Sequence, residues 1–152
     1  MVVIDEKTLS RAAARDRRSV YLLIRRAFSL SLLTVFDLPL VAITCPQRDA
    51  SAVPLQSLTM LNDAFLEEQA EHFAARVAAM AAGARERAVR AAFRLALARP
   101  PSSVELRLCC RLLERQATVY LAAKLPSRQA EYKALVQMCL VLFNTSEFLY
   151  VE

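Results

Sequence analysis

The sequence has 152 residues, one glycine and a formal net charge of +5, and hydrophobic residues make up 56% of it. This length suits one domain with a substantial core. A single glycine disfavours a fold with many tight turns and excludes the glycine-rich loops that bind phosphates and dinucleotides. The moderately basic charge allows an anionic partner without requiring one.

The first third of the chain predicts two helices and one irregular segment. The helices are expected over 8–15 and 28–36, where Pro39 follows the second. The apolar run over 19–24 fits either a strand or a buried helix, because periodicity cannot separate them in so short a segment. Residues 41–53, which prolines and aspartate punctuate, predict a loop of about a dozen residues.

This region does not have the pattern of a membrane span or a signal peptide. Residues 20–45 are the most apolar, but Arg25, Arg26 and Asp37 interrupt them. A membrane-spanning helix needs about 20 nearly continuous apolar residues. Acidic residues come early in the chain, and no apolar core precedes a small-residue cleavage site. The sequence by itself therefore assigns no compartment.

From residue 54 onward, apolar residues recur three and four positions apart, which predicts helices. These are expected over 54–61, 64–82, 84–98, 103–123 and from 127 onward. The prediction is an all-α fold: a single domain over 1–152 that forms a bundle of about five or six helices.

The expected helix ends depend on residue types with defined roles. Aspartate and serine accept hydrogen bonds from the free N–H groups of a first helical turn, and glycine adopts the left-handed backbone that ends many helices. Proline cannot continue a helix, and S-x-x-E forms a capping box. The assigned positions are Asp63 and Ser127 as N-caps, Gly83 as C-cap, Pro100–Pro101 as a stop, and Ser102 with Glu105 as the capping box.

Apolar stripes on these helices give the expected core. The helix over 103–123 carries two stripes, the second formed by Leu108 and Leu112, so burial on more than one side is expected. The other residues expected to face inward are Leu66, Ala70, Phe73, Val77, Met80, Val89, Phe93, Ala96, Leu97, Leu106, Cys109, Cys110, Leu113, Ala117, Tyr120, Tyr132, Leu135, Val136, Cys139 and Phe143.

The four cysteines and the single histidine give no strong signal of a metal or redox site. Cys45, Cys109, Cys110 and Cys139 show no C-x-x-C spacing. They are interpreted as reduced thiols; a disulfide from Cys139 to Cys109 or Cys110 is the alternative. His72 has no ligand at metal-binding spacing, so it is interpreted as a structural or surface residue. No cofactor is expected.

Several blocks of the sequence resemble a known family. They are RRSVYLLIRR at 17–26, FDLP at 36–39, R-x-x-S-x-VPLQSL-x-x-LN at 48–62, QA at 69–70, AFRLALARPPSSVE at 92–105 and NTSEFLYVE at 144–152. On these blocks the chain resembles the C-terminal domain of unknown function fifteen-fifty-three of large planctomycete-type proteins. It departs from the family pattern at Leu23, Ser51 and Ala98, where proline, threonine and glycine are usual.

The resemblance implies that the chain corresponds to the C-terminal half of the family domain. Family members often also carry a cytochrome-c-like segment and a second uncharacterised domain, which this sequence does not contain. The resemblance also implies export or a location in the cell envelope. Its expected partner is the upstream half-domain, another protein or a second copy of the chain.

The first functional hypothesis is a non-catalytic structural or interaction module, so the chain is not expected to be an enzyme. One alternative is a basic helical module that binds nucleic acid or an acidic polysaccharide through its N-terminal arginines. A weaker alternative is part of a polysaccharide-acting enzyme, which requires Asp37, Arg48 and Glu147 to line one deep pocket. The candidate interaction surface consists of Arg17, Arg18, Leu23, Arg25, Arg26, Phe28, Asp37, Arg48 and Glu147. Within it, Asp37 is expected to cap a turn, and Glu147 is a candidate to anchor the C-terminus to an arginine.

Overall fold

The computed structural model describes residues 35–36 and 54–150, and the structural statements below concern these residues. The chain divides into two compact units, Met1–Ala52 and Val53–Glu152. The expected elements over 8–15, 19–24 and 41–53 lie outside the described residues. Val35 is helical and Phe36 lies in a turn, as expected for a helix that ends before Asp37. The single domain over 1–152 stays a prediction.

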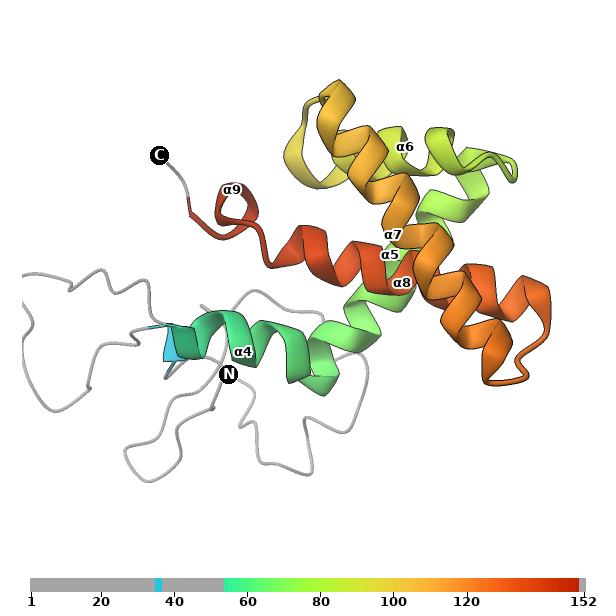
Figure 1. Ribbon diagram of the computed structural model, residues 1–152. Helices are drawn as coiled ribbons and strands as arrows, with labels where there is room; N and C mark the ends of the chain where they lie inside the picture. Colours follow the sequence, from blue (N-terminus) through green and yellow to red (C-terminus); the bar gives the residue numbers. More distant parts are fainter. Residues whose placement is uncertain (1–34, 37–53, 151–152) are drawn as a thin grey trace, which may run out of the picture. The chain divides into compact units, whose positions relative to one another are not determined.

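The second unit has six α-helices over residues 54–150, and no strand is described in these residues (Figure 1). This confirms the predicted all-α fold, and the expected helix bounds differ from the observed ones by about one residue. The helices are α4 (Pro54–Asn62), α5 (Ala64–Ala81), α6 (Arg85–Leu97), α7 (Ser103–Ala122), α8 (Ser127–Phe143) and α9 (Ser146–Leu149).

Two of the three predicted N-caps are confirmed. Asp63 Oδ1 accepts hydrogen bonds from the N–H groups of Phe65 and Leu66, at 2.9 and 3.4 Å. Ser102 and Glu105 form the reciprocal capping box at the start of α7. The third prediction is wrong, because Ser127 is already helical and Pro126 is the N-cap of α8. Proline has a fixed φ and no N–H, so it can precede a helix without a side-chain cap.

The ends of α5 and α6 adopt left-handed backbone without relying on glycine alone. Gly83 has the expected positive φ of 82°, but the C-cap of α5 is Ala82, with φ 45°. At the end of α6, Ala98 adopts φ 55°, so the turn keeps this conformation without glycine. A residue with a Cβ atom in this region costs about 1 kcal/mol.

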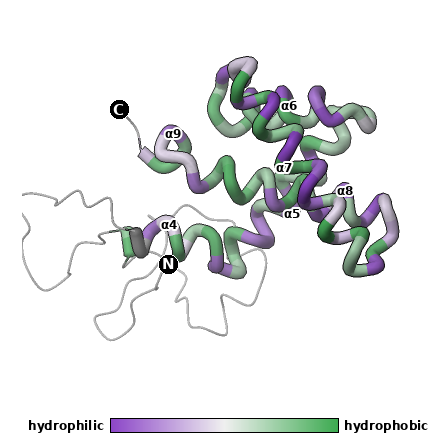
Figure 2. The backbone as a smooth tube through the Cα atoms, viewed as in Figure 1, coloured by the Kyte–Doolittle hydropathy of each residue, from purple (hydrophilic) through white to green (hydrophobic). Residues whose placement is uncertain are grey.

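Helix α8 is the centre of the described unit, since it packs against each of the other five helices. Nine of its residues are buried, and Met138 and Cys139 are 0% exposed. Figure 2 shows the hydrophobic half of α8 that leads to α9. The predicted burial of Leu135, Val136 and Phe143 is confirmed, but Tyr132 remains 37% exposed.

The predicted burial of α7 on more than one side is wrong. Leu108 is 58% exposed, and only Leu113 and Ala117 of this helix are buried. The reason is that α7 packs against α6 and α8 alone among the described helices, so one of its sides has no helical neighbour. On α5, Met80 is likewise 59% exposed, since it lies near the end of the helix.

Cys109, Cys110 and Cys139 are free thiols, which supports their interpretation as reduced cysteines over the disulfide alternative. Burial raises the pKa of the Cys139 thiol to about 12. Because the thiolate is the reactive form, Cys139 is an inert core residue near neutral pH. Cys45 lies outside the described residues.

Candidate functional site

Three sequence blocks that carry the family resemblance meet at the C-terminal tail. PLQSL lies on α4, ARPPSSVE spans the turn from α6 to α7, and the tail continues from the end of α8 through α9. We call this assembly the C-terminal clasp. It consists of Gln56, Ser57, Arg99, Glu105, Asn144, Glu147, Phe148 and Tyr150.

Arg99 is the centre of the clasp, and its guanidinium group binds two carboxylates. Its Nε and Nη2 atoms donate to the two oxygens of Glu147, both at 2.7 Å. Its Nη2 and Nη1 atoms donate to the two oxygens of Glu105, at 2.7 and 3.0 Å. Nη1 also donates to the carbonyl of Pro100 at 3.2 Å. An arginine side chain has five N–H donors, and these contacts use all five.

The position of Arg99 follows from the turn that precedes α7. Ala98 ends α6 in the left-handed conformation, and the two prolines after Arg99 prevent further helix. The guanidinium carbon lies 5.5 Å from the centroid of the Phe93 ring, within the range of a cation–π contact. Glu105 is held separately, since its Oε2 atom accepts a hydrogen bond from Ser102 N at 2.7 Å.

The electrostatics of the clasp keep all three groups ionised. Hydrogen bonds from Arg99 lower the pKa of Glu105 to about 2, with a further contribution from the Ser102 backbone. Hydrogen bonding to Arg99 also lowers the pKa of Glu147. The two carboxylates raise the pKa of Arg99 further above its usual value. None of the three is therefore suited to exchange a proton near neutral pH.

The tail is also attached to the core by aromatic rings. Phe148 stacks on Phe143 of α8, with ring centroids 4.9 Å apart and an interplanar angle of 26°. The Phe143 ring in turn lies 5.3 Å from that of Phe73 on α5. Aromatic pairs at such distances add about 0.5–1.5 kcal/mol beyond the burial of their surface. The row of rings thus connects α9 to two of the larger helices.

Hydrogen bonds join the tail to α4. The Tyr150 hydroxyl donates to Oε1 of the buried Gln56 at 2.6 Å. The Nδ2 atom of Asn144 donates to the Ser57 carbonyl at 3.4 Å. The tail therefore links the first described helix to the turn between α6 and α7. The clasp holds these segments together, and its charged groups are already engaged in ion pairs with one another.

The structure brings only part of the predicted interaction surface into view. Glu147 is anchored to an arginine, which confirms that expectation, and it lies in the exposed part of the clasp. The remaining eight residues lie outside the described ranges, so their role stays a prediction. They are Arg17, Arg18, Leu23, Arg25, Arg26, Phe28, Asp37 and Arg48.

His72 lies exposed on α5, as expected for a surface histidine. Across the described ranges, no three histidine, cysteine or acidic side chains gather where they could hold a metal ion. None of the helices from α4 to α9 combines the length and apolar character needed to cross a bilayer.

Sequence reasoning assigned a role to Glu105 and Glu147 of the clasp and missed the other six residues, which are Gln56, Ser57, Arg99, Asn144, Phe148 and Tyr150. Arg99 lies directly before the two prolines, and its neighbour Glu105 was already assigned to the capping box. One signal was available in the sequence. Arg99 lies in a turn before the acidic residue Glu105 of the next helix, and an arginine can bind two carboxylates from different segments. Gln56 and Tyr150 are 94 positions apart, and no sequence periodicity relates residues at such a separation.

We expect the contribution of the clasp to stability to depend on pH below neutrality. Glu105 has an ordinary pKa of 4.5 and a folded pKa of about 2, so its stabilising effect is complete above pH 4.5 and is lost as pH falls toward 2. Glu105→Gln removes the charge and keeps a residue that suits the capping box. Denaturation at several pH values measures the free energy of unfolding of both proteins. The variant should be less stable than the native chain by a constant amount above pH 5, and this difference should shrink below pH 4.5. A difference independent of pH would contradict the ion pair.

Residues 54–150 form an all-α unit in which the clasp joins the C-terminal tail to other helices. A family model described as "PSD1: Protein of unknown function (DUF1553)" matches residues 4–113. The chain therefore belongs to this family. The match includes the PLQSL and ARPPSSVE blocks, and the tail lies beyond it. No curated protein and no solved structure matches the chain.

Proposed function

We propose that the chain is a non-catalytic helical module with a structural or interaction role. The single observation that carries the proposal is that Arg99 binds both Glu105 and Glu147, with its remaining donor on the Pro100 carbonyl. A catalytic site needs at least one group that is free to bind substrate or to exchange a proton. Among the described residues, the charged groups of the clasp supply fastenings between helices.

Exposed apolar side chains give the module surfaces on which a partner could dock. On the uncovered side of α7, Val104, Leu108 and Val119 are all exposed. Their spacing of four and eleven residues places them on one side of the helix. On α4, Leu58 and Leu61 are exposed as well. Apolar side chains grouped on a surface favour association with another protein.

The expected partner is the upstream part of the family domain or a second copy of this chain. We expect self-association in the micromolar range in the absence of the upstream part, because two apolar faces can then pair with each other. Light scattering coupled to size-exclusion chromatography measures the mass. Leu23→Glu with Phe28→Glu should reduce that mass to the monomer and raise solubility.

A matched pair of variants locates the surface. Val104→Glu with Leu108→Glu places the same charges on α7, in side chains that the structure shows to be exposed. If this pair gives the monomer and the N-terminal pair does not, the interaction surface lies on α7. An unchanged mass in both double variants, together with no capture of an upstream fragment, would contradict the proposal.

The basic-module alternative has one observation in its favour. Arg107, Arg111 and Arg115 are exposed at intervals of four residues on α7, and none forms an ion pair with a described residue. In the same experiments, retention on heparin or duplex DNA that falls steeply with salt would favour this alternative. Absence of retention at low salt would reject it.

A further inference from the structure

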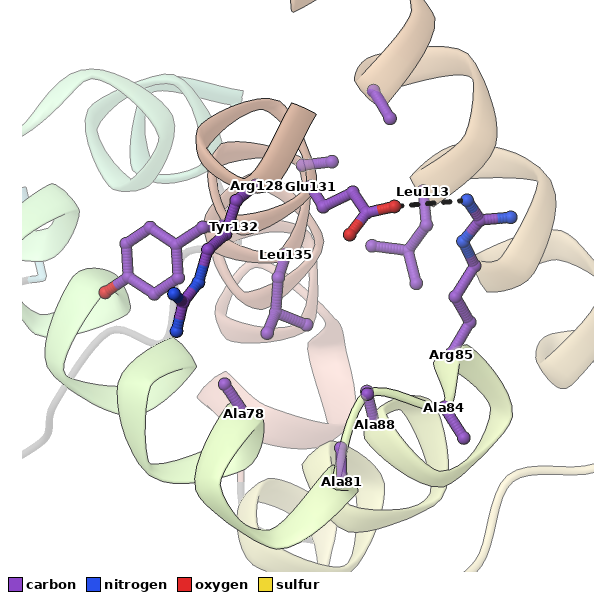
Figure 3. Close-up of a pocket in the computed structure, with 13 residues that line it drawn as sticks. Ala78, Ala81, Ala84, Arg85, Ala88, Leu113, Arg128, Glu131, Tyr132 and Leu135 are labelled. Carbon is purple, nitrogen blue, oxygen red and sulfur yellow. Dashed lines mark ion pairs between the residues drawn. The ribbon is translucent and has the colours of Figure 1, made fainter. Parts of the chain in front are cut away.

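A pocket of about 360 Å³ lies among α5, α6, α7 and α8, and it shares no residue with the C-terminal clasp (Figure 3). Pockets that bind small molecules typically measure about 300–1,000 Å³ and have mostly apolar walls with a few polar groups. This pocket meets both criteria. No role in the proposed interaction module accounts for it.

The pocket exists because small residues line its floor. Figure 3 shows Ala78, Ala81 and Ala88 on the α5 and α6 side, opposite Leu135 of α8. Alanine side chains fill little of the space between helices, so they leave room that longer side chains would occupy. Leu113 of α7 adds an apolar wall. The result is a concave apolar surface suited to a short hydrocarbon or aromatic body.

The charges at the rim differ between the two sides of the pocket. Arg85 is paired with Glu114 at 3.5 Å and with Glu131 at 3.7 Å. Arg128 on the other side forms no ion pair with any described residue. Tyr132 lies beside it in Figure 3, and its hydroxyl already donates to the Glu71 carbonyl at 3.0 Å. The rim therefore offers one positive charge that the described residues leave unpaired.

We propose that this pocket binds a small molecule with an apolar body and one carboxylate, such as a medium-chain carboxylic acid. The body lies against the alanine floor, where its burial supplies most of the affinity. The carboxylate pairs with Arg128, whose planar guanidinium group suits two parallel hydrogen bonds to a carboxylate. Glu131 at the opposite rim disfavours a second negative charge on the ligand.

The test is a titration of the full chain with octanoate and, as the uncharged match, octanol. Heteronuclear NMR follows the alanine methyl groups and gives both the affinity and the position of binding. We expect saturable binding of octanoate at one site. Arg128→Gln should lower the affinity for octanoate by about tenfold, the effect expected from losing a charge-assisted pair. It should leave the affinity for octanol nearly unchanged.

Two matched controls keep the test specific. Ala78→Leu fills the pocket and should lower the affinity for both compounds by about tenfold. Its control, Ala75→Leu, adds the same volume on α5 outside the pocket. Arg115→Gln removes an equal charge from α7. No saturable binding of either compound would overturn the proposal. Binding of octanoate that ignores Arg128→Gln would overturn the pairing of the carboxylate, and equal effects of the two leucine variants would place the site elsewhere.

Discussion

Met138→Ala is expected to lower the free energy of unfolding by about 2–5 kcal/mol, the range for removing a long apolar side chain from a closed core. Met138 is 0% exposed and lies on α8, the helix that contacts every other described helix. The cavity would therefore open in the buried part of the central helix. Chemical denaturation of the full chain, followed by circular dichroism, measures the loss.

A nearby position on the same helix provides the control. Val141 is 46% exposed, so Val141→Ala removes apolar surface that is already in contact with water. Its effect should stay within about 1 kcal/mol. Equal losses in the two variants would mean that α8 does not have the central position described here.

Helix type and helix ends could be predicted from the sequence because local physics determines them. The capping box at Ser102 and the N-cap at Asp63 depend on residues within one turn of each other. Burial was harder to predict, because it depends on which helices are neighbours. Leu108 belongs to an apolar stripe and is exposed, since α7 has described helices on only part of its surface.

The clasp could be predicted only in part. The sequence supported an ion pair between Glu147 and some arginine, but Arg99 is 48 positions away and no pattern connects the two. The pocket was not foreseen either. Its alanine floor looks in the sequence like ordinary helix-forming residues, and the space it leaves depends on the angles between four helices.

The second large effect is expected at the clasp. Arg99→Gln removes the ion pair that holds the tail through Glu147, the ion pair with Glu105 of α7 and the cation–π contact with Phe93. We expect the tail to open more often, so cleavage by chymotrypsin after Phe148 should become about tenfold faster, because proteolysis follows the population of the open form. Mass spectrometry of timed digests measures this rate.

Two further variants separate charge from geometry. Arg99→Lys keeps the charge but lacks the five-donor fork, so its cleavage rate should lie between those of the native chain and Arg99→Gln. Arg94→Gln removes an exposed arginine of α6 with no described partner and should leave the rate unchanged. A tail that resists cleavage equally in all variants would show that Arg99 does not hold it.

The central claim is that the C-terminal clasp fastens the tail to the other helices. Amide hydrogen exchange of the native chain tests this claim most directly. The N–H groups of Phe148, Leu149 and Tyr150 are hydrogen-bonded within α9, a helix of four residues that is far too short to be stable alone. Any protection of these amides must therefore come from the clasp. We predict clear protection at all three, and exchange at the rate of an unstructured peptide would contradict the account.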